Sequence, residues 1–538
     1  MRDFPKVIAF SVLSLAIAAQ AQNIYVAQSS AGGDTGADCA DARALSTLTS
    51  SDWTAGNTIH LCGTITATPG TSGLVARGSG TSGSPITVKF ETGAVLQASY
   101  FGGVPNASSC YSLATCRGGI QVYNSSNIII DGGTNGIIQN TANGTDLANH
   151  QASLGVSISG GSNFIVRNLT IKNIYINDPT TQDTAGGYTG DVSISNGATN
   201  VRVCNNSLLN ARTGISSDTG GGSAPTYPLP TCSSNTFTSS VNFFGNTLND
   251  HAWQFQPSGS SSPVVNIFGN DVSGNTNWLE SGDEFHTDGI IAWGDMGVQL
   301  TLYAFDNLFH DTAYGTAAIY CTYGQTGSGC EGYIFNNVFE VDSADANSSA
   351  AIWLNGTSGY PLGPYYLYNN TFVNNGVMIV FSDQSQPVVI ENNLVTEGTA
   401  AGNYFYSKGY GTNTLPSILT TSDYNSFYGG RGLSFSGVGI YYGWPTGSWG
   451  SYSSWTTTGF DTHSVSANPQ INGSYQLSNN SPDIRAGANL FSLCGTPGLG
   501  PLCYDKNGVA RPATGPWDIG AFQFRGPNSP VGLTGTAK

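Results

Sequence analysis

The sequence predicts an all-β solenoid, in which short parallel strands wind into stacked coils. A short motif of apolar residues, Asn and a further apolar residue recurs along the chain. Segments of three to six residues rich in β-branched and aromatic side chains dominate residues 120–396. The chain has 71 Gly and only 9% charged residues, yet 39% of it is hydrophobic, which favours strands joined by tight turns over disorder. Because one such unit cannot bury its own apolar side, the units must stack.

Every copy of the motif carries an Asn one or two positions before its last apolar residue. The copies place it at Asn206, Asn246, Asn270, Asn307, Asn337, Asn370 and Asn393, with a related earlier version at Asn168. A fixed core with unequal spacing is typical of one structural unit that carries loops of different length. Since each coil rises ~4.8 Å, the repeated amides are expected to form an internal ladder at a turn rather than a catalytic site.

The two ends of the chain differ from this regular part. Residues 1–21 resemble a secretory signal, with Arg2 and Lys6, then an apolar run, then Ala19-Gln20-Ala21. A membrane anchor is the alternative, but the apolar run is shorter than the ~20 residues that a span needs. We expect an exported chain without a membrane span, with one β-helical domain over 22–525, regular coils over about 120–396 and a loose tail over 526–538. Residues 40–50 are the best helix candidate and would cap the open end of the stack.

All ten cysteines follow the signal and fall into sequence-local pairs. An even number of cysteines in an exported chain favours disulfides. Proximity suggests the pairs Cys39 with Cys62, Cys110 with Cys116, Cys204 with Cys232, Cys321 with Cys330, and Cys494 with Cys503.

The formal net charge of -16 makes nucleic acid an unsuitable partner, because binding to phosphate needs a basic face. The sequence leaves the oligomeric state open.

The C-terminal part carries a more specific pattern. It contains the segments 468–471, 481–487 and 505–512 and closes on Asp518-Ile519-Gly520-Ala521-Phe522. With these segments and the Asn repeats, the chain resembles the right-handed parallel β-helix family, the fold of pectate lyases and polygalacturonases. The resemblance implies the fold and not an activity. Asp505, Arg511 and Asp518 are expected to pin the last coil.

The densest polar cluster spans residues 280–290, with five acids and one His up to Asp295 in a chain poor in charge. The catalytic candidates are His286, Asp288 and Asp311, followed by Asp283 and Glu284. Counted from the Asn motif, Asp250 and Asp311 occupy one column, ~10 Å apart at two strand spacings.

Aromatic residues supply the candidates for substrate binding. These are Trp293, Tyr320, Trp353, Tyr314 and Trp253, together with His310. We expect Trp293, Tyr320, Trp353 and Phe381 to align in one outward column, a platform for sugar rings. An internal aromatic stack is the alternative.

The distribution of cations limits the mechanism. No Lys or Arg occurs from Thr213 to Ser407, so the Arg or Lys base that the resemblance implies for lyases has no candidate in the central coils. Elimination would need His286 or His310 with Tyr314, and Ca²⁺ held by Asp283, Glu284 and Asp288. Hydrolysis is simpler, because two carboxyl groups suffice and crowding raises the pKa of one of them. The polygalacturonase motifs are absent.

Two hypotheses follow. One is a secreted carbohydrate-active enzyme, a glycoside hydrolase or polysaccharide lyase, with a groove along the Asn246, Asn270 and Asn307 coils that acts on an extracellular or cell-wall polysaccharide. The other is a non-catalytic carbohydrate-binding adhesin or structural solenoid, in which the acid cluster is a structural Ca²⁺ site or a loop anchor. A Ser-His-Asp hydrolase is a distant third, since no Gly-x-Ser-x-Gly elbow is present.

Overall fold

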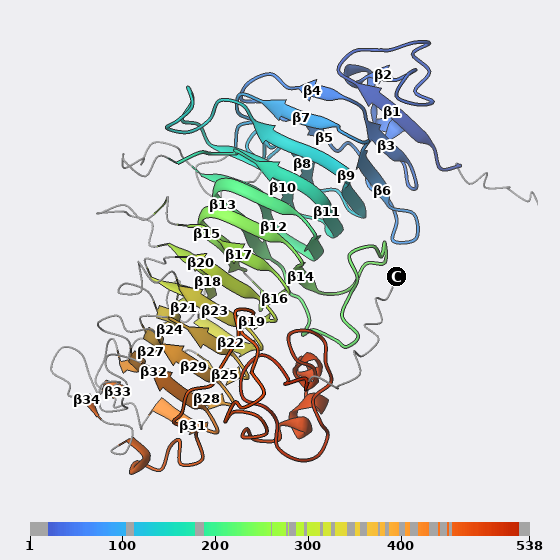
Figure 1. Ribbon diagram of the computed structural model, residues 1–538. Helices are drawn as coiled ribbons and strands as arrows, with labels where there is room; N and C mark the ends of the chain where they lie inside the picture. The colour runs from blue at the N-terminus through green and yellow to red at the C-terminus, as the bar shows by residue number, and fades with distance from the viewer. Residues whose placement is uncertain are drawn as a thin grey trace, which may run out of the picture.

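The chain folds as a right-handed parallel β-helix, which confirms the predicted fold class (Figure 1). The structure is a computed structural model. It describes residues 20–103, 112–177, 188–259, 261–275, 278, 287–294, 298–312, 316–323, 329–341, 350–355, 363–374, 377–381, 387–397, 404–408, 418–429, 440–441, 449–450 and 455–526.

Each coil contributes one strand to each of three parallel sheets, and some long strands bend from one sheet into the next. Sheet 1 comprises β5 (Leu74–Val75), β8 (Ile120–Tyr123), β10 (Ser153–Ser159), the start of β12 (Thr189–Cys204), the ends of β13 (Ser207–Thr219) and β15 (Thr247–Ser258), β18 (Asp288–Gly294), β21 (Ala317–Tyr323), β24 (Ala350–Asn355), β27 (Val377–Phe381) and β30 (Tyr404–Lys408).

Sheet 2 comprises β1 (Asn23–Ala27), β3 (Thr58–Leu61), β6 (Ile86–Phe90), the starts of β9 (Ile128–Asn140) and β11 (Ser162–Lys172), the end of β12, β14 (Val241–Phe244), β16 (Val264–Phe268), β19 (Gln299–Phe305), β22 (Gly329–Phe335), β25 (Tyr365–Tyr368), β28 (Val388–Glu391) and β31 (Leu419–Asp423). The short β2 (Arg43–Ala44) pairs with β1.

Sheet 3 comprises β4 (Thr64–Thr66), β7 (Val95–Ala98), the ends of β9 and β11, the starts of β13 and β15, β17 (Asp271–Ser273), β20 (Leu308–Thr312), β23 (Val338–Val341), β26 (Thr371–Val373), β29 (Leu394–Glu397) and β32 (Ser426–Gly429). A separate antiparallel pair joins β33 (Ile440–Tyr441) and β34 (Trp449–Gly450).

The predicted asparagine ladder runs through the turns between sheets 2 and 3. Its members are Asn206, Asn246, Asn270, Asn307, Asn337, Asn370, Asn393 and Asn425. In each step the backbone N–H and Nδ2 of one Asn donate to the Oδ1 of the next, as Asn270 does to Asn307 at 3.1 and 2.9 Å. The same Nδ2 also donates to a carbonyl of an earlier coil, Phe243 for Asn270. Every polar atom of the buried amide therefore has a partner.

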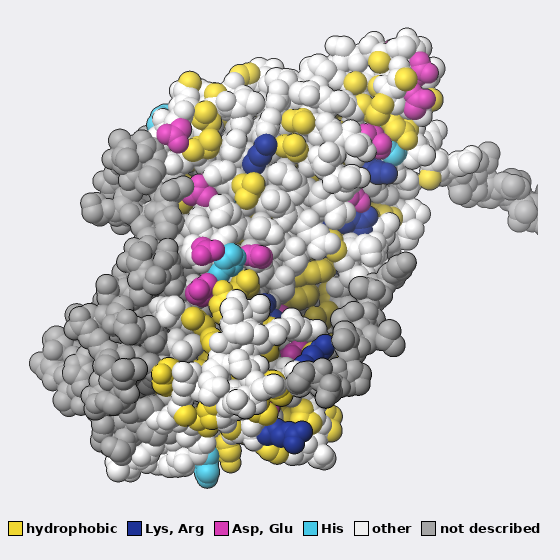
Figure 2. All heavy atoms as spheres, viewed as in Figure 1, with side chains coloured by type: hydrophobic (Ala, Val, Ile, Leu, Met, Phe, Trp, Pro, Cys, Tyr) yellow, Lys and Arg dark blue, Asp and Glu magenta, His cyan; other side chains and the backbone are white. Residues whose placement is uncertain are grey.

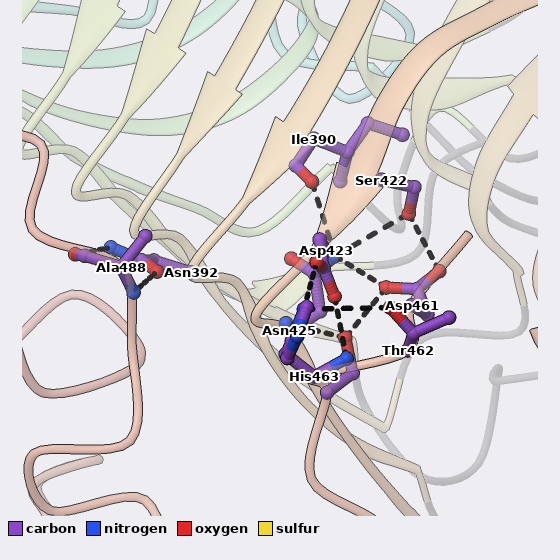
Figure 3. Close-up of polar contacts among 10 residues, drawn as sticks. Ile390, Asn392, Ser422, Asp423, Asn425, Asp461, Thr462, His463 and Ala488 are labelled. Carbon is purple, nitrogen blue, oxygen red and sulfur yellow. Dashed lines mark hydrogen bonds and ion pairs between the residues drawn. The ribbon is translucent and has the colours of Figure 1, made fainter. Parts of the chain in front are cut away.

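An aspartate ends the ladder, as Figure 3 shows. Asn425 Nδ2 donates to Asp461 at 2.9 Å, and Ser422, Ser464 and the Trp455 indole N–H donate to the same carboxylate. A carboxylate only accepts hydrogen bonds, so it terminates a chain of donors without leaving one unpaired.

In the C-terminal residues 455–526, the first part still stacks on the last coil, where Asp461 N–H donates to the Ser422 carbonyl and Val465 pairs with Ser426 of β32. The later residues leave the coils and pack against the outside of the stack beside β22, β25 and β28 (Figure 1). Their apolar side chains cover a stack of aromatic rings at the end of sheet 2, in which the centroids are 4.7–4.8 Å apart. These rings are Phe244, Phe268, Phe305 and Phe335.

The charged residues of this segment are structural, as predicted, but they anchor it to the turns of the middle coils and not to the last coil. Arg511 is buried and donates to Asn336 Oδ1 at 2.9 Å. The Asp518 carbonyl accepts from Asn369 Nδ2 at 3.1 Å. The Asp505 carboxylate accepts three backbone N–H groups of its own segment.

The predicted helix over residues 40–50 is wrong. This stretch contains β2 and a 3-10 turn at Leu45–Thr47, and a second 3-10 turn spans Ser50–Asp52. A capping box at Thr49 and Asp52 favours the second turn but fixes only three residues. Leu48 and Trp53 are nevertheless buried in the core at this end of the stack.

Four of the five predicted disulfides form, with Cα atoms 5.6–5.8 Å apart. They are Cys39–Cys62, Cys204–Cys232, Cys321–Cys330 and Cys494–Cys503. The fifth prediction includes Cys110, which lies outside the described residues, as do residues 1–19 of the predicted signal. Within the described ranges, no helix has the length and apolar character that crossing a membrane requires.

Candidate functional site

Sheet 1 bends once in every coil, and the bend decides which side chains face outward. In each coil one position of the strand does not pair with the next strand. In β10 and β12, for example, Leu154 pairs with Gly190 and Val156 with Val192, whereas the residues between them do not pair. A Cβ built at Gly214, which occupies this position, would lie 2.6 Å from the Leu248 side chain of the core. The position therefore points inward, and so does the next residue, as the buried Ile215 shows.

Two outward columns flank the bend. Ala317 and Ala350 of the first column pack with Tyr320 and Trp353 of the second, in a cluster separate from the central core. Register extends the first column to Trp253 and Asp288. We define the front face as Arg212, Trp253, Gln256, Asp288, Tyr320, Trp353 and Asn355.

The front face carries partly exposed aromatic rings with polar groups beside them. The Arg212 guanidinium lies 4.8 Å from the centroid of the Trp253 ring, within the range of a cation–π contact. Tyr320 and Trp353 meet edge to face, with centroids 5.7 Å apart. Asn355 Nδ2 donates to the Tyr320 hydroxyl at 2.6 Å. Of the predicted sugar-binding candidates, Trp253, Tyr320 and Trp353 therefore lie on the front face.

Asp288 is the one predicted catalytic residue on this face that the structure describes. It pairs in register with Trp253 on one side and Ala317 on the other. Its side chain is fully buried, and its Oδ1 accepts the Ala317 backbone N–H at 3.2 Å. His286, Asp283, Glu284 and Tyr314 lie outside the described residues, and so does the side chain of Trp293.

The predicted column of four aromatic residues is wrong in two places. Tyr320 does pair with Trp353, but Trp293 pairs with Thr322 and Phe381 with Leu354. The prediction matched each ring to a preceding apolar residue. Several apolar residues follow one another in these strands, and the loops before them differ in length, so the pattern fits more than one register.

His310 and Asp311 face outward from sheet 3 and not from the front face. His310 Nδ1 lies 2.7 Å from Asp311 Oδ2, and its Nε2 lies 2.7 Å from Asp271 Oδ1. Hydrogen bonds to Asp271 and then Asp311 raise the pKa of His310 to about 9, and the His310 contact lowers the pKa of Asp271. Figure 2 shows acidic side chains gathered around a histidine on a face that otherwise carries few charges.

The predicted column of Asp250 and Asp311 is confirmed. Both residues have left-handed backbone conformations, with φ of 62° and 46°. Gly274 of the intervening coil has φ 62°, and its N–H donates to the Asp311 carbonyl at 3.1 Å. The two acids therefore mark one corner of successive coils, between sheets 3 and 1.

Sequence reasoning missed a polar pair inside the helix. His251 Nε2 lies 2.8 Å from Asp191 Oδ2, and both side chains are fully buried. The two residues are two strand spacings apart. The coil between them carries the small residues Ala211 and Gly214 at the corresponding positions, which leaves room for the contact. Burial lowers the pKa of His251 to about 3 and raises that of Asp191, so the pair favours uncharged forms.

The environment of this pair is unusual for a protein core. In the part of the chain that the structure describes, Asp191 Oδ1, His251 Nδ1 and both amide atoms of the buried Gln254 have no hydrogen-bond partner. Ordered water is the usual partner of such groups. The signal in the sequence was a single acid, Asp191, at an inward position of residues 189–195, which otherwise hold only Gly, Ser, Thr, Val and Ile.

The sequence also predicted no cation in the central coils, and the structure corrects this prediction for the front face. Arg212 precedes the stretch that lacks Lys and Arg by one residue. The pairing of β13 with β15 places its guanidinium over Trp253 of the next coil.

Comparisons with known proteins give resemblances of fold at low sequence identity. No family model and no curated protein matches the sequence. Among solved structures, the chain is similar to pectate lyase Pel9A, with 14% identity, a TM-score of 0.44 and coverage of 93% of this chain and 96% of that one. It is also similar to XylC in complex with xylose, with 10% identity, a TM-score of 0.45 and coverage of 94% and 98%. A family 28 exopolygalacturonase of Yersinia enterocolitica shares 12% identity, with a TM-score of 0.34 and coverage of 68% and 74%.

Proposed function

We propose that this protein is a secreted carbohydrate-active enzyme that binds a polysaccharide chain along the front face. The observation that carries the proposal is the set of partly exposed rings Trp253, Tyr320 and Trp353, which lie on β15, β21 and β24 of sheet 1, with β18 between the first two. Such rings stack on the apolar faces of sugars. The amides of Gln256 and Asn355 beside them both donate and accept, as sugar hydroxyls require.

Arg212 favours an acidic polysaccharide. Its planar guanidinium matches a carboxylate with two parallel hydrogen bonds, and its place over Trp253 brings that charge next to a stacked sugar ring. Arg212 acts here as an electrostatic partner of the substrate, because an Arg side chain does not lose its proton in proteins.

For the chemistry, we propose hydrolysis by two carboxyl groups, with Asp288 and one acid of the pair Asp283 and Glu284 as acid and base or nucleophile. Elimination with His286 as the base is the alternative route. In that route a Ca²⁺ ion held by Asp283, Glu284 and Asp288 would offset the charge of the substrate carboxylate. Within the described ranges no group of three or more His, Cys, Asp or Glu side chains forms a metal site, so the calcium hypothesis depends on residues beyond them.

A non-catalytic carbohydrate-binding protein is the second candidate, and one observation favours it. The Asp288 carboxylate is fully buried and accepts a backbone N–H of the next strand, which is a structural contact. In this case the same rings would hold a glycan without cleaving it.

Export is part of the proposal. Four disulfides within the described residues are consistent with an oxidising compartment, as expected if residues 1–21 are a signal.

A screen on neutral and acidic polysaccharides, with and without chelator, tests the proposal. Reducing ends report hydrolysis, and the absorbance of unsaturated products reports elimination. We expect activity on an acidic polymer that falls in Trp353→Ala through KM and is abolished in Asp288→Asn. Phe491→Ala, which removes an exposed ring far along the chain in the C-terminal segment, is the matched control and should keep full activity.

The outcomes separate the two candidates. Binding without turnover, lost in Trp353→Ala but kept in Asp288→Asn, would establish the binding protein instead. Equal activity of wild type, Trp353→Ala and Asp288→Asn would contradict the proposed site.

A further inference from the structure

The C-terminal segment contains a cleft that the proposed function does not use. Its volume is about 360 Å³, within the ~300–1,000 Å³ of small-ligand pockets. Polar and mostly uncharged side chains line it, among them Gln476, Asn479, Asn507 and Arg525, with Phe524 at one wall.

The lining side chains are available to a ligand. Among the residues that the structure describes, none forms a hydrogen bond or ion pair with the side chains of Gln476, Asn479, Asn507 or Arg525.

The single acid of the cleft is already occupied. The Asp505 carboxylate accepts the backbone N–H groups of Asn507, Val509 and Gln523 at 2.7–2.9 Å and is almost fully buried. These donors compensate its charge, whereas Arg525 is exposed and lacks such compensation. The cleft therefore favours an anionic group near Arg525.

We propose that this cleft is a second saccharide-binding site, and that it takes a sugar with a carboxylate. Amides that both donate and accept match vicinal hydroxyls. A guanidinium matches a carboxylate. A phenyl ring beside them packs on the apolar face of a sugar ring. The inference rests on the proposed function for its choice of ligand class.

The site is held rigidly on the β-helix. The turns after β22 and β28 bind the C-terminal segment. Asn336 accepts from Arg511 and donates to the Tyr504 carbonyl, and Asn392 both donates to and accepts from the backbone of Ala488. A chain bound in the cleft is therefore held at a fixed place on the same solenoid that carries the front face, which would raise the local concentration of substrate.

Calorimetric titration of the full chain with trigalacturonate tests the proposal. The double variant Trp253→Ala, Trp353→Ala serves as the background, since it removes both Trp rings of the front face and leaves the C-terminal segment intact. We expect trigalacturonate to bind this background, and Arg525→Ala to weaken that binding at least tenfold. Arg525→Lys should restore only part of the affinity, because it keeps the charge without the planar fork.

Neutral xylotriose should bind the background at least tenfold more weakly than trigalacturonate. Absence of trigalacturonate binding in the background, an unchanged affinity in Arg525→Ala, or equal affinity for xylotriose would each overturn the proposal. Arg525 is exposed, so its variants should keep the melting temperature of their parent. Polysaccharide turnover by Arg525→Ala at saturating substrate reports the front face alone, so a failure of the proposed function is visible separately.

Discussion

Removal of one ladder amide, Asn307→Ala, is a sharp test of what stabilises the solenoid. The Asn307 side chain is fully buried, and its Oδ1 accepts from both the backbone N–H and the Nδ2 of Asn270. Its Nδ2 donates to Asn337 Oδ1 and to the Ile267 carbonyl at 3.0 and 2.9 Å. The substitution thus removes four hydrogen bonds and leaves two buried N–H groups of Asn270 without an acceptor, the backbone N–H and one of the two on Nδ2, whose other N–H still reaches Phe243.

The expected loss of stability follows from those two donors. A buried donor without a partner costs about 1–3 kcal/mol, so two of them cost about 2–6 kcal/mol. Because a solenoid is stabilised by contacts between neighbouring coils, the loss should be felt first in the coils of Asn270 and Asn337.

Asn249→Ala is the matched control from the same part of the stack. The Asn249 side chain is only partly buried and donates a single bond, to Ser273 Oγ at 3.0 Å. Its loss should cost about 1 kcal/mol, as for an ordinary hydrogen bond. Urea unfolding followed by circular dichroism, together with hydrogen exchange of the middle coils, measures both variants. If Asn307→Ala costs no more than Asn249→Ala, the ladder is not a principal source of stability and the reasoning fails.

Three further predictions follow from particular contacts. The folded state raises the pKa of His310 from 6.5 to about 9, so its contribution to stability is full below pH 6.5 and is lost as pH rises through 9. Between pH 6 and pH 10, the melting temperature of wild type should therefore fall more than that of His310→Gln. If the two melting temperatures fall equally with pH, the contacts of His310 with Asp271 and Asp311 do not stabilise the fold. Asp461→Asn places an amide among four donors. We expect a lower melting temperature than for Asp423→Asn, whose carboxylate is hydrogen-bonded to the exposed His463. Arg212→Ala should raise KM for an acidic polysaccharide about tenfold, which corresponds to a loss of ~1.4 kcal/mol of binding free energy. KM for a neutral polysaccharide should not change. An equal rise in both KM values would exclude a role of Arg212 in recognising the substrate charge.

The sequence by itself determined the architecture of this protein. The Asn motif predicted the ladder residue by residue from Asn206 to Asn393, because the apolar residues on either side repeat at a fixed distance within each turn. Four disulfides were predicted from proximity in the sequence, because the two cysteines of each pair are at most 28 residues apart. The turn at Asp250 and Asp311 also followed from counting, because each acid lies only four positions after its ladder Asn.

Only the tertiary structure decided the composition of the front face and of the interior. Loops of different length precede the strands of sheet 1, so the count from the ladder no longer gives their register, and Trp293 and Phe381 leave the predicted column. The bend in each strand turns two consecutive residues inward, which simple alternation does not allow for, and it buries Gln254 and Asp191. Arg212 contacts Trp253, which is 41 residues later in the sequence, and His251 contacts Asp191, which is 60 residues earlier. Both contacts depend on how the coils stack, which no local sequence pattern indicates.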